Sequence, residues 1–331
     1  DSVKNGGIFD GPAGVVMGLE IARVLHEAGV KTRYPLEFAA LIEEEGARFG
    51  GGLYGSRVMT GQVSREMLDQ IKDRDGVSMA EAMRDFGLNP DRIADAVRPA
   101  GSLKAFIEMH IEQGPILENE GLEAGLVKTI VGIAQKEVEI LGRADHAGTT
   151  PMEMRCNALA AAAEAVLFLD GAARKAGGGT VGTVGRMEVY PGGTNIVPGR
   201  VFFTTDVRAA EMERITEVTD AFGEFLKSLE KRGVEVRVTD RITVAPVDMS
   251  PEIVALFDGE AKSRGYSHKV MQSGAGHDAM IMADITEVGL VFVPSKGGRS
   301  HCPEEWTDYD QIKKGVDIVL GAILALAEAQ D

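Results

Sequence analysis

The chain has 331 residues, of which 44% are hydrophobic and 26% charged; this excludes a disordered tail and predicts about two globular domains. The 35 Lys and Arg residues against 51 Asp and Glu residues give a net charge of −16, which argues against nucleic acid or anionic lipid as a partner. No apolar stretch reaches the roughly 18 residues that span a bilayer, so we expect no membrane anchor. Cys156 and Cys302 are too few for a disulfide scaffold and favour a cytoplasmic location.

The first part of the chain alternates between predicted helices and strands. Residues 13–26 carry apolar side chains at the spacing of a helix. Residues 36–42 form a short, nearly all-apolar run, which is typical of a parallel strand buried on both faces. Three glutamates follow at residues 43–45, where we expect the carboxyl end of that strand. Ser78 and Glu81 have the spacing of a capping box at the start of a helix.

A second strand is predicted over residues 105–111, where polar and apolar residues alternate. Because successive side chains of a strand point to opposite faces, Glu108, His110 and Glu112 are expected on one face.

A different pattern begins near residue 127. The predicted order is strand, helix, strand, strand, helix and strand, over residues 138–141, 151–176, 180–189, 200–207, 210–232 and 234–244. This order is typical of a ferredoxin-like α+β domain, in which helices cover one antiparallel sheet.

After residue 246 the α/β alternation returns, with a strand over 290–293 and a last helix over 309–329. We therefore predict an α/β domain with a mainly parallel sheet, made of residues 1–126 and 246–331. An inserted α+β domain of residues 127–245 interrupts it.

Acidic and histidine side chains gather at predicted strand ends and in glycine-rich segments. In an open parallel sheet, ligands bind outside the carboxyl ends of the strands, so residues distant in sequence can converge there. Carboxylates and imidazoles suit a divalent ion such as Zn²⁺ or Mn²⁺, and one carboxylate can bridge two ions. The candidate residues are Asp10, Glu44, Glu45, His110, His146, His277 and His301.

Simpler interpretations exist for each feature. A run of glutamates is usually a solvated turn, although three acidic groups at residues 43–45 would repel one another unless cations neutralised them. His110 alone is also compatible with a hydrogen-bonded core histidine. The segment 192–195 could be a plain turn, and Asp206 and Arg208 could pair with each other on one strand face.

Eight motifs carry a resemblance that extends over essentially the whole chain. They are DSVKNGGIFDGPAGV, EEEGARFGGGLYGSR, EMHIEQGPILE, ADHAGTTPM, GGTNIVPGRV, DVRA, SGAGHDAM and SHCPEEW. In this order they resemble the N-carbamoyl-L-amino-acid hydrolases (L-carbamoylases). These belong to the dinuclear-metal amidohydrolases, together with allantoate amidohydrolase and β-ureidopropionase. The resemblance implies a metallopeptidase-type catalytic domain with an inserted dimerisation domain.

The resemblance also implies a metal site for two divalent ions, which could be Zn, Mn, Co or Ni. Asp10 matches the carboxylate that bridges both ions, and Glu45, His110 and His301 match ligands of the individual ions. Glu44 matches the general base.

Further residues match groups that contact the substrate. His146 matches a histidine that reaches the active site of the partner subunit and stabilises the oxyanion, which implies a homodimer. Arg208 offers a planar fork for the substrate carboxylate, and Asn195 offers a neutral hydrogen bond beside it. Gln113 and His277 also match substrate-recognition positions.

The implied reaction is hydrolysis of the ureido C–N bond of an N-carbamoyl-L-amino acid, a small-molecule substrate, to L-amino acid, CO2 and ammonia. Allantoate and N-carbamoyl-β-alanine are alternative substrates for the same chemistry. A non-catalytic carboxylate-binding protein is an alternative of another kind, but the intact pair of Glu44 and Glu45 favours catalysis.

One family motif, G-S-H-x-D, is incomplete. Its Asp aligns with Asp1, so the metal-ligating histidine two residues earlier is not in the sequence. We therefore expect a further segment upstream, with strands and a helix of the catalytic domain, and an incomplete shell for one ion in the chain as given.

Overall fold

The computed structural model describes residues 3–330, so Asp1 of the incomplete motif lies outside the described part. The chain divides into two compact units, Val131–Val247 and the combination of Asp1–Ile130 with Asp248–Asp331. The second of these is called the α/β unit below, and Val131–Val247 is called the α+β unit. Within residues 3–330, none of the helices combines the length and apolarity needed to cross a membrane.

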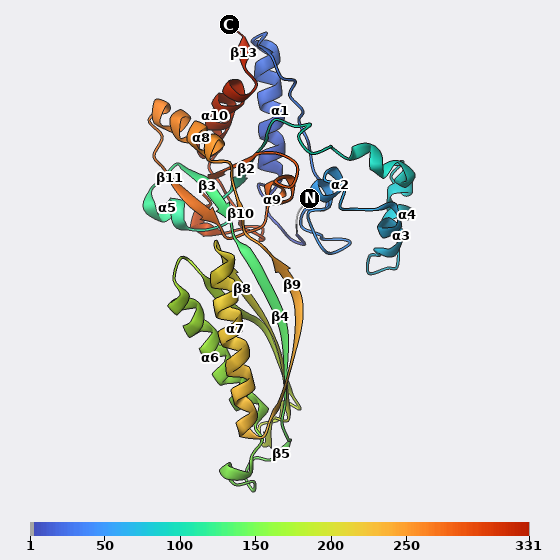
Figure 1. Ribbon diagram of the computed structural model, residues 1–331, viewed down its shortest axis with the longest axis vertical. Coiled ribbons are helices and arrows are strands. Elements are labelled where there is room, and N and C mark those ends of the chain that lie inside the picture. Colours follow the sequence, from blue (N-terminus) through green and yellow to red (C-terminus); the bar gives the residue numbers. More distant parts are fainter. Residues whose placement is uncertain (1–2, 331) are drawn as a thin grey trace. The chain divides into compact units, whose positions relative to one another are not determined.

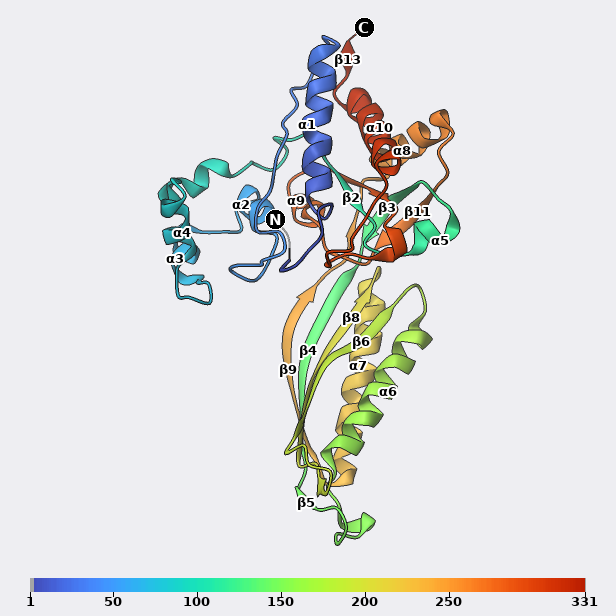
Figure 2. The same cartoon turned by 180° about the vertical axis from the view of Figure 1, so that it is seen from behind.

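The α/β unit is built on a mixed five-stranded sheet (Figures 1 and 2). Its strands are β2 (Phe106–Ile111), β3 (Ala124–Ile130), β10 (Val247–Asp248), β11 (His268–Ser273) and β12 (Val288–Val293). The order is β10-β3-β12-β2, with β11 also paired to β3. β12 is parallel to β2, and β11 to β3, but β12 runs antiparallel to β3. The predicted mainly parallel sheet is therefore mixed in direction.

Helices α1 (Pro12–Glu27), α8 (Pro251–Arg264) and α10 (Tyr309–Leu326) bury their apolar faces against this sheet. The core includes Phe257 of α8, Ile318 of α10 and all six residues of β12. The predicted helix is confirmed as α1, but its buried face is Ala13, Met17, Ile21 and Leu25. The apolar stripe expected from the sequence, Val15, Val16, Leu19, Ala22 and Leu25, is wrong except for Leu25, because Val15, Val16 and Leu19 are exposed.

Smaller elements complete the α/β unit: α2 (Tyr54–Met59), α3 (Arg65–Gln70), α4 (Met79–Asp85), η1 (Pro90–Ala96), α5 (Ile116–Glu120), α9 (Asp278–Met282) and η4 (Lys296–Gly298). The strands β1 (Lys31–Thr32) and β13 (Ala329–Gln330) pair with each other. The predicted capping box of Ser78 and Glu81 is confirmed at the start of α4.

The strand predicted over residues 36–42 is wrong. These residues are extended but pair with no strand among the described residues, and Phe38 and Ile42 are 44% and 64% exposed. An apolar run forms a buried strand only where a neighbouring strand pairs with its backbone N–H and C=O groups. β2 is the edge strand of the described sheet, and it does not pair with residues 36–42.

The α+β unit is a four-stranded antiparallel sheet in the order β6-β8-β4-β9. The strands are β4 (Gly132–Leu141), β6 (Val181–Tyr190), β8 (Arg200–Ala209) and β9 (Glu235–Val244). Helices α6 (Ala158–Ala176) and α7 (Met212–Ser228) cover one face, and η3 (Leu229–Arg232) follows α7 (Figures 1 and 2). The main elements follow the order β-α-β-β-α-β.

Two details of this unit differ from or add to the prediction. α6 begins at Ala158, not residue 151, because the side chain of Asn157 accepts the N–H groups of Leu159 and Ala160 at 3.0 and 3.1 Å and so caps the helix there. A 3₁₀ turn, η2 (Met152–Met154), precedes it. The short strands β5 (Asp145–His146) and β7 (Ile196–Val197) pair at one end of the unit.

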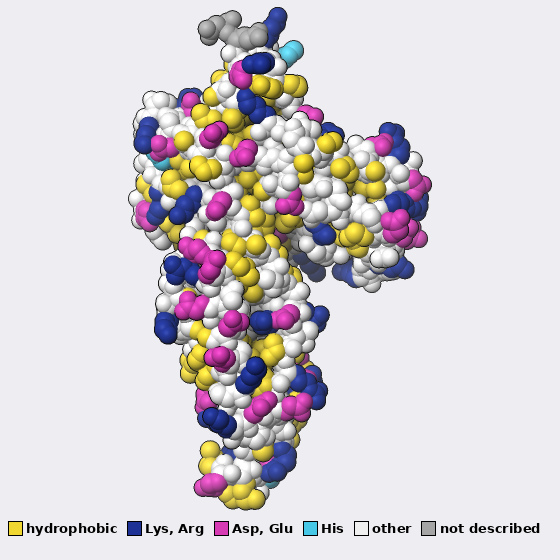
Figure 3. Space-filling view, in the orientation of Figure 1, with side chains coloured by type: hydrophobic (Ala, Val, Ile, Leu, Met, Phe, Trp, Pro, Cys, Tyr) yellow, Lys and Arg dark blue, Asp and Glu magenta, His cyan; other side chains and the backbone are white. Residues whose placement is uncertain are grey.

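Charged side chains of both signs are interspersed over the visible surface of the α+β unit (Figure 3). On the sheet, Arg200 pairs with Glu139 and Arg241 pairs with Glu137 across neighbouring strands, at 2.5 and 2.6 Å.

Candidate metal and active site

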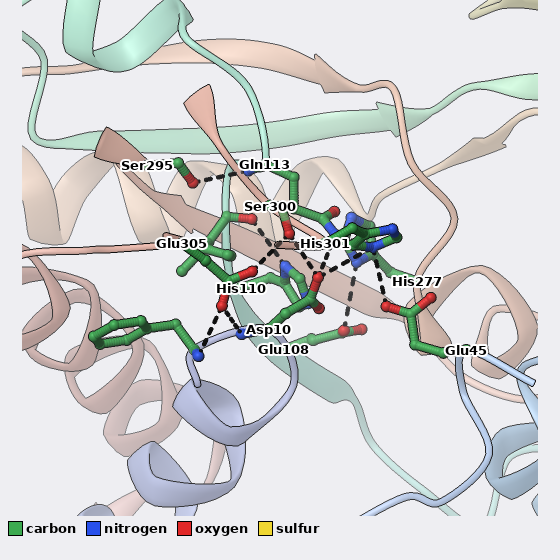
Figure 4. Close-up of polar contacts among 12 residues, drawn as sticks. Asp10, Glu45, Glu108, His110, Gln113, His277, Ser295, Ser300, His301 and Glu305 are labelled. Atoms are coloured by element: carbon green, nitrogen blue, oxygen red, sulfur yellow. Dashed lines mark hydrogen bonds and ion pairs between the residues drawn. The ribbon is translucent and has the colours of Figure 1, made fainter. Parts of the chain in front are cut away.

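Asp10 is the centre of the site. It lies just before α1, is 6% exposed, and directs its two carboxylate oxygens to two different histidines (Figure 4). Oδ1 lies 3.1 Å from Nε2 of His110, and Oδ2 lies 3.3 Å from Nε2 of His301. A carboxylate placed in this way can contribute one oxygen to each of two ions.

Asp10, Glu45 and His301 offer ligand atoms that all lie within 4.8 Å of one another. Nε2 of His301 is 3.1 Å from Oε1 of Glu45. Two ligand atoms of a tetrahedral Zn²⁺, each about 2.0–2.1 Å from the ion, lie about 3.3–3.4 Å apart. The donor types and the two His301 distances therefore fit a divalent ion bound by these three residues.

His110 belongs to β2, and a backbone carbonyl group on the side of the ring away from Asp10 orients its imidazole. Its Nδ1 lies 2.8 Å from the carbonyl oxygen of Ile111, which can only accept, so Nδ1 carries the proton and Nε2 faces Asp10. Burial lowers the pKa of His110, but the hydrogen bond and charge of Asp10 outweigh this and raise it to about 9. For Asp10 the signs are reversed. Burial alone would raise its pKa, but the hydrogen bond and charge of His110 outweigh burial and hold the pKa below its ordinary value.

Gln113 follows β2 in a left-handed conformation, with a φ of 57°. Its Nε2 donates to Oδ2 of Asp10 at 2.8 Å. Its Oε1 is buried and has no hydrogen-bond partner within residues 3–330. Buried acceptors without a donor are rare, and an N–H or O–H of a bound molecule would satisfy this one.

Glu44 and Glu45 lie in a loop that folds back onto the start of α2. The N–H groups of residues 53–55 donate to the carbonyl groups of residues 44, 43 and 42 at 2.7, 3.2 and 3.1 Å. Gly52 has a φ of 59°, and a Cβ there would lie 2.5 Å from the carbonyl oxygen of Glu44. Glycine is therefore required where the loop closes.

Burial and the charges of Asp278 and Glu45 raise the pKa of Glu44 to about 8. A carboxylate with such a pKa can both take and return a proton near neutral pH. The pKa of Glu45 is also raised, mainly by burial.

His277 is only 2% exposed and packs behind His110, with 4.6 Å between ring centroids. Its Nε2 lies 3.0 Å from Oγ of Ser273, whose hydroxyl donates to the carbonyl of Ala275, so Nε2 is the donor. Its Nδ1 lies 3.8 Å from Oε1 of Glu108. Burial and then the charge of His110 lower the pKa of His277 well below its ordinary value. Because both nitrogens face protein groups, a substrate contact of His277 stays a prediction.

Two carboxyl groups beside these histidines, those of Glu108 and Asp278, have no role predicted from the sequence. Oε2 of Glu108 accepts the N–H of Ala279 at 2.9 Å, and Oδ1 of Asp278 accepts the hydroxyl of Ser56 at 2.5 Å. Burial and the charge of Asp278 raise the pKa of Glu108 to about 7, and burial raises that of Asp278. The alternation along β2 already indicated that Glu108 shares a face with His110.

His146, Asn195 and Arg208 belong to the α+β unit. His146 in β5 is exposed, and its Nδ1 accepts the N–H groups of Gly148 and Thr149 at 3.0 and 3.2 Å. In the neutral ring, Nε2 therefore carries the proton and can donate it. Asn195 lies next to this strand, since its carbonyl accepts the N–H of Ala147 at 2.9 Å.

Arg208 lies on β8 and forms two hydrogen bonds with Asp206, Nε to Oδ1 at 2.8 Å and Nη2 to Oδ2 at 3.1 Å. Gln135 of β4 donates to the same Oδ2 at 2.8 Å. The pairing considered from the sequence is therefore present, and it holds the guanidinium in a defined plane.

Residues 2–325 match the peptidase family M20/M25/M40, and the chain belongs to this family of hydrolases. It is 47% identical to the N-carbamoyl-L-amino-acid amidohydrolase of Paenarthrobacter aurescens over 327 residues, which cover 98% of this chain and 79% of that protein. It is 40% identical to the N-carbamoyl-L-amino acid amidohydrolase of Geobacillus stearothermophilus, over 100% of this chain and 80% of that protein.

A solved structure of a hydantoinase/carbamoylase family amidase from Burkholderia multivorans superposes with a TM-score of 0.92 at 34% identity. The match covers 99% of this chain and 79% of that one. The resemblance seen in the motifs is thereby confirmed.

Proposed function

We propose that this chain hydrolyses the ureido C–N bond of N-carbamoyl-L-amino acids. The observation that carries the proposal is the Asp10 carboxylate, whose oxygens face His110 and His301 separately, beside the pair Glu44 and Glu45. The similarity to amidohydrolases named for this substrate supports the choice of substrate.

In this proposal two divalent ions would be held by four residues: His110 would bind one ion, Glu45 and His301 would bind the other, and Asp10 could offer one carboxylate oxygen to each. When bound, the ions would lower the pKa of a water molecule and polarise the ureido carbonyl group. Gln113 holds Oδ2 of Asp10, and its unpaired Oε1 can accept a hydrogen bond from the substrate or the attacking water.

Glu44 acts as the general base and then as the general acid. It takes a proton from the attacking water as the new C–O bond forms, and it returns the proton to the amine nitrogen as the C–N bond breaks. The products are the L-amino acid and carbamic acid, which decomposes to CO2 and ammonia. The raised pKa of Glu44, about 8, suits both transfers.

Arg208 binds the substrate carboxylate in this proposal, and Asn195 adds a neutral hydrogen bond. The planar guanidinium carries N–H donors in the fork geometry that suits a carboxylate, and Asp206 holds its plane. His277 supports His110 by packing behind it.

His146 stabilises the oxyanion from the partner subunit of a homodimer. Its Nε2–H is a donor because Nδ1 is occupied by two backbone N–H groups. Arg200 pairs with Leu141 at the end of β4, and Arg208 pairs with Ile133 near its start. β5 follows that end of β4 (Figure 1) and pairs with β7, so both short strands lie beyond the Arg200 end of β8. Eight residues of strand span about 27 Å, which a small ureido acid cannot bridge. This separation within one α+β unit supports a site that combines Arg208 of one subunit with His146 and Asn195 of the other.

Product analysis tests the proposed function. Full-length protein, with any segment that precedes Asp1, is loaded with Mn²⁺ and incubated with N-carbamoyl-L-methionine, its D-enantiomer, allantoate and N-carbamoyl-β-alanine. We expect L-methionine and one ammonia per turnover, with kcat/KM highest for the N-carbamoyl-L-amino acid. Exclusive turnover of allantoate or of the β-alanine derivative would contradict the proposed substrate, and no turnover of any of the four would contradict the proposed reaction.

A further inference from the structure

Glu305 is a buried carboxyl group outside the proposed ligand set. Its side chain reaches the loop before α1, almost three hundred residues away in sequence, and the residue is 3% exposed (Figure 4). Oε1 accepts the backbone N–H groups of Phe9 and Asp10 at 2.9 and 3.0 Å. One oxygen thus holds two successive backbone N–H groups, that of Asp10 and that of the residue before it.

The other oxygen of Glu305 is connected to the Asp10 side chain through Ser300. Oγ of Ser300 lies 2.8 Å from Oε2 of Glu305 and 2.8 Å from Oδ2 of Asp10. Oδ2 is the oxygen that faces His301. The hydroxyl has one proton, so it donates to one of the two carboxyl groups at a time, and Glu305 and Asp10 share this donor. Glu305 therefore holds the backbone of Asp10 directly and shares a hydrogen-bond donor with its carboxylate.

The packing leaves Glu305 little freedom to move. A Cβ at Gly7 would collide with the Glu305 side chain, so only glycine lets the loop approach this closely. On the neighbouring residues, the rings of Phe9 and Trp306 pack edge to face, with 5.3 Å between centroids. The two loops, residues 7–10 and 300–306, are thus held together from both sides.

We propose that Glu305 is a positioning residue for the metal site: it orients the Asp10 carboxylate so that each oxygen faces its own histidine. The inference rests on the metal site of the proposed function. Groups behind the ligands commonly change metal affinity by 10- to 100-fold when removed, because an unrestrained ligand must be ordered on binding. Glu305 differs from a residue that only stabilises the fold, because it accepts hydrogen bonds from the backbone at Asp10. It also shares the Ser300 hydroxyl with the Asp10 carboxylate.

Three substitutions in the full chain separate positioning from folding. Glu305→Met has a similar volume but no acceptor for the N–H groups of Phe9 and Asp10. Glu305→Gln keeps an oxygen for them. Glu304→Met is the matched control, because the adjacent Glu304 is largely exposed and pairs with Arg299 at 3.0 Å on the surface. Zn²⁺ affinity is measured by competition with a chromophoric chelator, and melting temperature is measured without metal.

We expect the Zn²⁺ Kd of Glu305→Met to rise about 10- to 100-fold at a temperature where its circular dichroism equals that of wild type. Glu305→Gln should stay within a few-fold of wild type, and Glu304→Met should equal it. A wild-type Kd for Glu305→Met, or equal losses in Glu305→Gln and Glu305→Met, would overturn the inference.

Two further outcomes are also decisive. If Glu305→Met does not fold, Glu305→Asp, whose shorter side chain withdraws the acceptor from the N–H groups of Phe9 and Asp10, decides: a raised Kd supports positioning and an unchanged Kd rejects it. If the wild-type chain itself fails to bind Zn²⁺, the metal site of the proposed function is wrong and the inference falls with it. If the wild type binds Zn²⁺ and the Glu305 variants bind it with the same Kd, only the positioning role is rejected, and the metal site of the proposed function stands.

Discussion

A subunit-mixing experiment follows from the distance between His146 and Arg208. His146→Ala and Glu44→Gln should each abolish most turnover, one by removing the oxyanion donor and the other by removing the base. Because the two ends of β8 are separated by about 27 Å, one α+β unit cannot bring both His146 and Arg208 to a small substrate. If His146 comes from the partner subunit, a hybrid dimer of the two variants contains one site with both an intact Glu44 and an intact His146.

The expected recovery can be calculated. Random exchange between equal amounts of the two variants makes half of all dimers hybrids, and each hybrid has one active site out of two. Activity should therefore recover to about a quarter of wild type for a two-fold dimer. Turnover of N-carbamoyl-L-methionine is followed after exchange, with native mass spectrometry to count hybrids. Each variant alone, taken through the same exchange procedure, is the control. Hybrids that form without recovering activity would refute the placement of His146 in the partner's site.

Five changes, of which Glu44→Gln also serves in the mixing experiment, test separate parts of the account. Glu44→Gln should keep its metal and lose about 10²-fold or more in kcat, whereas Glu45→Gln should also lose metal; equal metal depletion by elemental analysis would reject this division of roles. Arg208→Lys should reduce kcat/KM strongly for the acid substrate but little for an amide-capped one, and equal sensitivity of both substrates would exclude Arg208 as the carboxylate contact. Removing metal with a chelator should lower the melting temperature, because ions that bind only the folded state stabilise it; an unchanged value would show that no such ion binds. Ser78→Ala should lower the free energy of unfolding by about 1 kcal/mol without changing kcat, as measured by urea denaturation, and a change in kcat would contradict the purely structural role of the capping box.

The sequence predicted much of the site because motif order identifies residues that converge irrespective of their separation. Asp10, Glu45, His110, Gln113 and His301 do lie together, although they come from four segments of the chain. The side-chain alternation along β2 was sufficient to place Glu108 on the face of His110. Whether Arg208 pairs with Asp206 could not be settled by spacing alone, because residues two apart on a strand share a face in any case.

Other features depend on tertiary contacts that no local pattern contains. Residues 36–42 are as apolar as a buried strand, but among residues 3–330 they pair with no strand, and only the sheet order reveals this. Glu305 belongs to a motif that was recognised, yet its importance lies in hydrogen bonds to Phe9 and Asp10 at the other end of the sequence. The start of α6 depends on the Asn157 cap, a signal that is present in the sequence but was not used in the prediction, which began the helix at residue 151.

Anomalous diffraction from crystals of the Mn²⁺-loaded protein tests the central claim, that Asp10 bridges two ions. The account predicts two peaks, one on each side of the Asp10 carboxylate and about 3.5–4 Å apart, the first next to Nε2 of His110 and the second between Glu45 and His301. A single peak, or peaks that do not contact Asp10, would contradict it.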